Sequence, residues 1–189
     1  MTWSFDKKNI KKENDRFCLN EILVRVLVKR VRENHGAGNV IETTVTGYTR
    51  ATITTHDGNK IILYAHPCFQ GNPRYDWAYV HFQEISVDGI EVENHYPSRI
   101  IGFIELDGGI TEAMIQCTEK PLLWSEIETD FFSTVKLDTS VDISIITVPI
   151  SALVHPLCVF PESFTSKERF VVVVLPKRNW SCYFGSKIK

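Results

Sequence analysis

The chain has 189 residues, of which 43% are hydrophobic and 23% are charged, and its net charge is −2. These proportions exclude a disordered or fibrous chain, and the most apolar run, residues 170–175, is too short to span a membrane. The five cysteines form no CxxC pair and predict no disulfide framework, and the N-terminus lacks the apolar segment of a signal peptide. We therefore expect a soluble intracellular protein with reduced thiols, with the nucleus as a candidate location.

The first predicted element is a helix over residues 6–33. Apolar residues recur there at steps of three and four positions, which is typical of a helix with one buried face: Ile22, Leu23, Val26, Leu27 and Val31. The β-branched valines leave a strand over residues 22–31 as the alternative. Residues 34–39 contain two glycines and end the element, so we assign residues 1–39 to an N-terminal helix and linker.

Short strands are predicted for most of the remaining chain. β-branched and aromatic residues indicate strands over residues 40–48, 51–55, 60–65, 76–82, 96–106, 111–117, 131–137, 143–148 and 170–175, with a closing aromatic piece at 180–184. Asp57-Gly58 and Asp88-Gly89 predict hairpin turns. The expected connections are an edge turn or 3₁₀ segment at residues 148–156 and loops at residues 66–75, 118–130 and 158–164.

The spacing of these strands leaves no room for helices between them, so the predicted pairing is antiparallel. Many short strands with tight turns indicate a mainly β fold. We expect a small antiparallel β-barrel or a strongly bent sheet, with one N-terminal helix. The barrel domain would span residues 40–184, and residues 185–189 would form a tail.

Residues 76–82 form an aromatic strand in which Trp77 and Tyr79 share one face, because successive strand side chains alternate. Tyr75 joins them by the same period, and Tyr96 is a further candidate. Aromatic rings that converge at an open corner can bind a quaternary ammonium group or stack on nucleobases. These four residues therefore form a candidate ligand-binding set, while a hydrophobic core that consumes the aromatic side chains is the alternative.

Two stretches together resemble the core of bromo-adjacent-homology-like and Tudor-like domains: Tyr-Asp-Trp-Ala-Tyr-Val at residues 75–80 and Tyr-Pro-Ser-Arg-Ile-Ile-Gly-Phe at residues 96–103. With Asn-Trp-Ser-Cys-Tyr-Phe at residues 179–184, their order is similar to that of small β-barrel domains in large transposon-like proteins of plants and protists. The resemblance covers residues 40–184 and implies a non-catalytic module recruited to chromatin, nucleic acid or a protein partner. Tudor-like domains use an aromatic cage for methylated lysine.

Cys68 is the candidate for catalysis, because His66 lies two residues before it and Asp76 and His81 follow. A thiolate paired with an imidazole is a nucleophile, and the same side chains could hold zinc. Neither a second paired ligand motif nor an oxyanion-hole glycine pattern is present, which favours a structural loop cysteine. We therefore expect no catalytic residue, metal or cofactor, and keep a cysteine-dependent hydrolase or transferase centred on Cys68 as the alternative.

The charge is distributed unevenly along the chain. Residues 1–33 carry a net charge of +4 and residues 165–189 a net charge of +5, so the residues between them carry −11. Basic side chains interleaved with aromatic ones suit phosphate contact and base stacking, and the second basic segment contains such a set: Lys177, Arg178, Trp180 and Lys187. Basic ends that pack against the acidic body or are merely solvated are the alternative.

Together these features predict a non-enzymatic interaction module associated with chromatin, nucleic acid or a mobile element. Its expected partner is a protein or a nucleic acid, and neither a membrane nor a small-molecule cofactor is expected. A structural subunit whose basic ends dock on neighbouring molecules is a further alternative.

Overall fold

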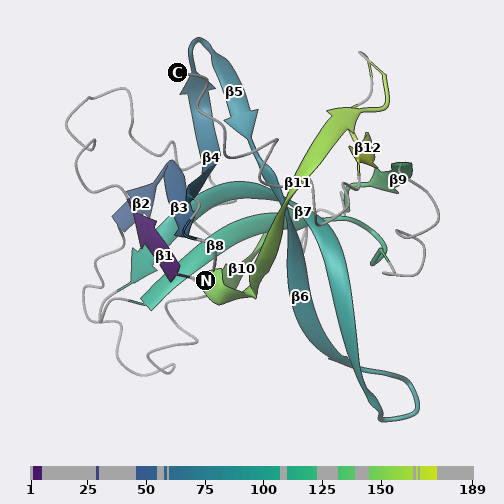
Figure 1. Ribbon diagram of the computed structural model, residues 1–189. Coiled ribbons are helices and arrows are strands. Elements are labelled where there is room, and N and C mark those ends of the chain that lie inside the picture. Colours follow the sequence, from purple (N-terminus) through teal and green to yellow (C-terminus); the bar gives the residue numbers. More distant parts are fainter. Residues whose placement is uncertain are drawn as a thin grey trace.

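The computed structural model describes residues 2–5, 29, 46–54, 58, 60–106, 110–122, 132–138, 145–163, 165 and 167–173. Within these residues the protein is mainly β and its strands pair in two antiparallel sheets, as the sequence predicts (Figure 1). The helix predicted over residues 6–33 lies outside the described residues except at Lys29, so the structure gives it no support. The predicted strand residues 40–45 and 180–184 also lie outside them.

The first sheet has four strands in the order β1-β3-β4-β5. Their bounds are β1 Thr2–Phe5, β3 Arg50–Thr54, β4 Lys60–Phe69 and β5 Asn72–Tyr75. β1 is not among the predicted strands, and it pairs with β3 on the side away from β4. The β3–β4 connection contains Gly58, whose φ of +76° suits glycine, as the Asp-Gly signal predicts.

Residues 66–75 form a hairpin rather than the predicted loop. β4 continues through this stretch, and β5 returns after the two-residue turn Gln70-Gly71. Both turn residues have positive φ, +51° and +88°, as a type I′ turn requires. Glutamine is an unusual residue for such a turn, and Pro67 and Pro73 argue against strands, so the local signal is misleading. Pro73 is tolerated because β5 is the outer strand of its sheet.

The second sheet has the order β10-β8-β7-β6-β11-β12-β9, and β2 pairs with the last part of β7. The bounds are β2 Thr46–Tyr48, β6 Trp77–Ile85, β7 Glu91–Leu106, β8 Ile110–Cys117, β9 Phe132–Lys136, β10 Ile145–Pro149, β11 Leu153–Pro161 and β12 Arg169–Val173. A 3₁₀ segment, η3 (Ile150–Ala152), links β10 to β11, as expected. Residues 158–161 belong to β11, whereas the sequence predicts a loop there. The prediction is wrong because the prolines at 156 and 161 obscure the strand pattern.

A closed barrel is not found in the described residues. The ladders leave the second sheet open, with β10 and β9 as its outer strands, and a bridge between Thr118 and Leu137 joins the end of β8 to β9. Figure 1 shows β6 and β7 as long curved ribbons. The register between β7 and β8 shifts between Ile100 and Gly102, and such a bulge increases the bend of a strand. The sheet is therefore curved without continuous pairing around a barrel.

Two hydrophobic cores lie on opposite faces of β6. On one face, Ala78 and Val80 belong to the core between the two sheets, with other buried members such as Ile53, Leu63, Ile100 and Phe103. On the other face, Trp77 and Tyr79 belong to a second core, whose remaining members are Leu122, Val135, Leu137, Leu157 and Val172. The predicted alternation along this strand is therefore correct, and both faces of its first half are covered.

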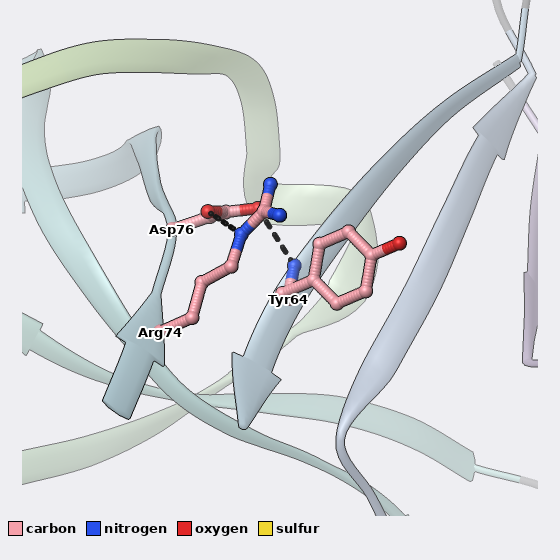
Figure 2. Close-up of polar contacts among 3 residues, drawn as sticks. All are labelled: Tyr64, Arg74 and Asp76. Carbon is pink, nitrogen blue, oxygen red and sulfur yellow. Dashed lines mark hydrogen bonds and ion pairs between the residues drawn. The ribbon is translucent and has the colours of Figure 1, made fainter. Parts of the chain in front are cut away.

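The chain passes from the first sheet to the second at Asp76. Its carboxylate accepts a hydrogen bond from the backbone N–H of Tyr64 at 2.8 Å, and its Oδ1 lies 3.3 Å from Nε of Arg74 (Figure 2). The backbone N–H of Asp76 donates to the carbonyl of Tyr64 at 2.8 Å, and the carbonyl of Asp76 accepts from the N–H of Ile100 at 2.9 Å. Asp76 therefore ties β4 to β7 and fixes the start of β6 between the two cores.

Candidate interaction site

The predicted ligand-binding residues Trp77 and Tyr79 are buried. Their exposed fractions are 6% and 1%, and the ring centroid of Trp77 lies 4.8 Å from that of Phe170. A cage for a quaternary ammonium group needs open ring faces. These two residues instead belong to the second core, which agrees with the alternative that the aromatic side chains of this strand are part of a hydrophobic core.

Tyr75 and Tyr96 lie away from that pair. Tyr75 packs against the core between the sheets, because the strand is interrupted at Asp76 and the alternation does not carry across it. The register with β7 places Tyr96 on the face of β6 opposite to Tyr79, and its ring centroid is 5.5 Å from that of Phe82. The structure therefore does not bring the four predicted residues together, which corrects the prediction of a shared aromatic site.

The structure does not describe the side chain of Cys68. The rings of the two histidines predicted as its partners lie near other aromatic rings. His66 is buried, with its ring centroid 6.2 Å from that of Phe69. The ring centroid of His81 is 5.1 Å from that of His95 on the neighbouring strand. Among the described residues, no group of three or more His, Cys, Asp or Glu side chains is placed to hold a metal ion. Also outside the description is the predicted nucleic-acid contact set: Lys177, Arg178, Trp180 and Lys187.

The β6–β7 hairpin projects from the body of the protein (Figure 1). Its two strands pair continuously from Trp77 to Ile85 on β6, whereas β11 pairs with β6 only as far as Val80. On the other side, β8 pairs with β7 only from Ser98 onward. The outer half of the hairpin therefore extends beyond the strands that flank its base.

The turn of this hairpin has a defined conformation. The N–H of Ser86 donates to the carbonyl of Ile90 at 2.8 Å, and the N–H of Gly89 donates to the carbonyl of Ser86 at 2.9 Å. The hydroxyl of Ser86 accepts a further hydrogen bond from the N–H of Ile90 at 3.1 Å. Gly89 has a φ of +75°, which a side chain would strain, so the turn predicted from Asp88-Gly89 is confirmed. These bonds fix how the end of the hairpin presents its side chains.

Large aliphatic side chains are exposed at the end of the hairpin. Their exposed fractions are 76% for Ile85, 106% for Val87, 64% for Ile90 and 37% for Val92. We call these four residues the apolar tip. Single exposed apolar residues are ordinary on protein surfaces, whereas four of them around one turn suit an interaction site. The register pairs Ile85 with Glu91 and Val92 with Glu84, so these two side chains point to opposite faces of the hairpin.

Acidic side chains surround the apolar tip. The exposed ones are Asp88, Glu91 and Glu93. Glu84, on the adjoining part of β6, accepts a hydrogen bond from the side-chain amide of Asn94 at 2.6 Å. Residues 83–93 contain no Lys, Arg or His and carry a net charge of −4. Residues 83–93 therefore present aliphatic and anionic groups together and no cationic group.

The sequence predicts the turn but not the apolar tip. The signal that could have found it is the pair Val87 and Ile90, which flank Asp88-Gly89 at a place where turns are normally polar. Alternation along a strand does not say whether its end extends beyond its neighbours, because that depends on pairing with distant strands.

No protein-family model matches the chain, and neither a curated protein nor a solved structure matches it. No helix in the described part of the chain is long and apolar enough to cross a membrane. The resemblance to bromo-adjacent-homology-like and Tudor-like domains stays a prediction.

Proposed function

We propose that the protein is a non-enzymatic interaction module that binds a protein partner through the apolar tip. The exposure of the tip is the observation that carries the proposal, because Val87 is fully exposed and Ile85 and Ile90 are more than half exposed. The hydrophobic cores of the described chain do not include these side chains. Covering such aliphatic surface is favourable by about 25 cal/mol per Å².

The shape of the hairpin supports docking into a partner. Because its outer half reaches beyond β8 and β11, the tip stands clear of the described strands and can enter a groove (Figure 1). The outer edges of the two strands can also pair with an extended segment of the partner, which is a common mode of peptide recognition.

The charge of the hairpin favours a protein over a nucleic acid at this site. Residues 83–93 carry −4, and phosphate groups would be repelled by the exposed carboxylates of Asp88, Glu91 and Glu93. Contact between nucleic acid and the basic set around Lys177 and Arg178 stays a prediction, as do a chromatin or mobile-element association and a nuclear location.

The absence of enzymatic activity also stays a prediction. The cysteine-dependent alternative stays open as well, because the structure does not describe the side chain of Cys68. A reactive Cys68 is the observation that would favour it.

The proposal is tested by placing a photo-crosslinking amino acid at Val87 in the full chain, expressed in cells, with the same amino acid at Ile62 as the control. Ile62 is an aliphatic strand residue of the first sheet with an exposed fraction of 42%. We expect ultraviolet light to produce discrete protein adducts from position 87 and not from position 62. A second control adds Ile90→Ser to the position-87 variant and should weaken the adducts.

Three results would contradict the proposal. The first is the absence of adducts at position 87 in excess of those at position 62. The second is an adduct that contains nucleic acid, which nuclease treatment would shorten. The third is a set of adducts that Ile90→Ser leaves unchanged. Adducts that persist unchanged with Ile90→Ser would show chance proximity rather than docking of the apolar tip.

A further inference from the structure

We infer that the partner of the apolar tip is the basic C-terminal segment, residues 174–189, of a second copy of this chain. The inference rests on the proposed function and names the occupant of the same site. It joins the projecting acidic hairpin to the basic, aromatic end of the sequence.

The two segments are complementary in charge. Residues 174–189 contain four Lys or Arg residues and no Asp or Glu, and residues 83–93 contain four Asp or Glu residues and no Lys or Arg. Opposite charges across an interface speed association and fix its orientation. The N-terminal segment is also basic, but it mixes five acidic residues among its nine basic ones. The C-terminal segment is therefore the better match for a wholly acidic hairpin.

The two segments are also complementary in their apolar groups. Residues 174–189 place three aromatic side chains among their basic ones: Trp180, Tyr183 and Phe184. The apolar tip presents Ile85, Val87, Ile90 and Val92 among exposed carboxylates. Aromatic anchors buried against aliphatic side chains, with charged pairs at the rim, are the usual composition of a specific protein interface.

The fold places Val173, the residue before the basic segment, and the apolar tip at opposite ends of β6. Val173, the last residue of β12, lies opposite Cys158, next to Leu157, which pairs with Trp77 at the start of β6. The tip begins with Ile85 at the other end of that nine-residue strand, about 30 Å away at the usual rise per residue. This polarity suits a head-to-tail contact in which the tip of one copy meets the basic segment of the next. Such heterologous contacts generate rings or open chains.

The inference predicts concentration-dependent self-association that salt weakens, because charge pairs are screened within about 8 Å at physiological ionic strength. The measurement is sedimentation velocity of the full chain over a hundredfold range of protein concentration, at 50 mM and 500 mM salt. We expect oligomers at low salt and monomers at high salt. Val87→Ser and Ile90→Ser should raise the concentration needed for association at least tenfold, and Ile62→Ser should leave it unchanged.

A charge exchange gives the sharpest test. One variant carries Glu91→Lys and Glu93→Lys on the hairpin, and the other carries Lys177→Glu and Arg178→Glu in the basic segment. Each should be monomeric alone, because one of its two surfaces has lost its net charge. The equimolar mixture should associate, because the unchanged basic segment of the first variant matches the unchanged acidic hairpin of the second. Circular dichroism of each variant confirms that the sheets form.

The outcomes separate the inference from the proposed function. A wild-type chain that stays monomeric at every concentration and salt overturns the inference, and so does a mixture of the two variants that fails to associate. Association that persists in either variant alone overturns it as well. If the chain is monomeric while Val87 still crosslinks to another protein, the proposed function stands with a different partner. If Val87 crosslinks to nothing, the proposed function itself fails.

Discussion

The carboxylate of Asp76 accepts a hydrogen bond from the backbone N–H of Tyr64 at 2.8 Å, and this contact spans the point where the chain changes sheets (Figure 2). Arg74 approaches the same carboxylate, with its Nε 3.3 Å from Oδ1, and places its guanidinium 4.1 Å from the ring centroid of Tyr64. The backbone of Asp76 bonds to both Tyr64 and Ile100. The contact therefore fixes the direction in which the chain leaves the first sheet and enters β6, the first strand of the projecting hairpin.

The structure predicts different effects for two substitutions of Asp76. Asp76→Ala removes the acceptor and leaves the N–H of Tyr64 without its side-chain partner, which should lower the free energy of unfolding by about 1–3 kcal/mol. Asp76→Asn keeps an acceptor oxygen and loses only the partly exposed ion pair with Arg74, which is worth less than about 1 kcal/mol. Urea denaturation at neutral pH measures both. Equal losses for the two variants would contradict the role of the hydrogen bond.

The same carboxylate should make stability depend on pH. Burial raises the pKa of Asp76 above 3.8, and the hydrogen bond from Tyr64 and the charge of Arg74 oppose this only in part. The folded chain therefore binds the proton at a higher pH than the unfolded chain does. As the pH falls through the folded pKa toward 3.8, the wild type should gain stability relative to Asp76→Asn, which shares its other titrating groups. A difference between the two unfolding free energies that is constant from pH 7 to pH 4, or that changes in the opposite direction, would refute the assignment.

Local sequence patterns predict most strands of this fold, because β-branched residues and turn signals are local properties. The Asp-Gly pairs at 57–58 and 88–89 identify two hairpins. The hairpin at Gln70-Gly71 escapes prediction, because its first residue is not one that usually adopts a positive φ and its strands contain prolines. The strand β11 also escapes prediction because it contains prolines, which only its pairing with β6 and β12 makes compatible with a sheet.

The unusual turn residue Gln70 offers a stabilising substitution. Its φ of +51° lies in the left-handed region, which costs a residue with a side chain about 1–2 kcal/mol and costs asparagine less. Gln70→Asn should therefore raise the unfolding free energy by about 0.5–1 kcal/mol. Gln83→Asn, at an exposed position in the extended strand β6, is the matched control and should give no gain. A gain at both positions, or at neither, would argue against the type I′ turn.

The exposure of side chains at the candidate site could not be predicted from the sequence. Alternation correctly places Trp77 and Tyr79 on one face of β6, but it cannot say that β9, β11 and β12 cover this face, because those strands lie more than fifty residues further along the chain. The same reasoning cannot say that Ile85 and Val92 lie beyond the strands that flank the base of the hairpin. Whether an aromatic or aliphatic residue is exposed is a property of the packed molecule.

Burial of Trp77 predicts a large effect on stability. Trp77→Ala removes an indole from the second core and its contact with Phe170, and should lower the unfolding free energy by about 3–5 kcal/mol. Ile90→Ser, at the exposed tip, should change it by less than about 0.5 kcal/mol. Urea denaturation of the two variants distinguishes a core residue from a surface-site residue. A Trp77→Ala protein as stable as the wild type would restore the interpretation of Trp77 as part of an open aromatic site.

The thiol of Cys117 should resist alkylation in the folded protein. Burial raises its pKa to about 11, and the hydrogen bond with Ser98 at 3.5 Å opposes this only in part. At pH 8 the reactive thiolate is then about one part in a thousand, so iodoacetamide should modify Cys117 only after denaturant is added. Cys158, whose pKa is also raised by burial, is the internal comparison, and peptide mass spectrometry follows each cysteine separately in one sample. Rapid labelling of Cys117 in the native protein would refute its burial. In the same experiment, a Cys68 peptide labelled far faster than that of Cys158 would favour the cysteine-dependent enzyme over the interaction module.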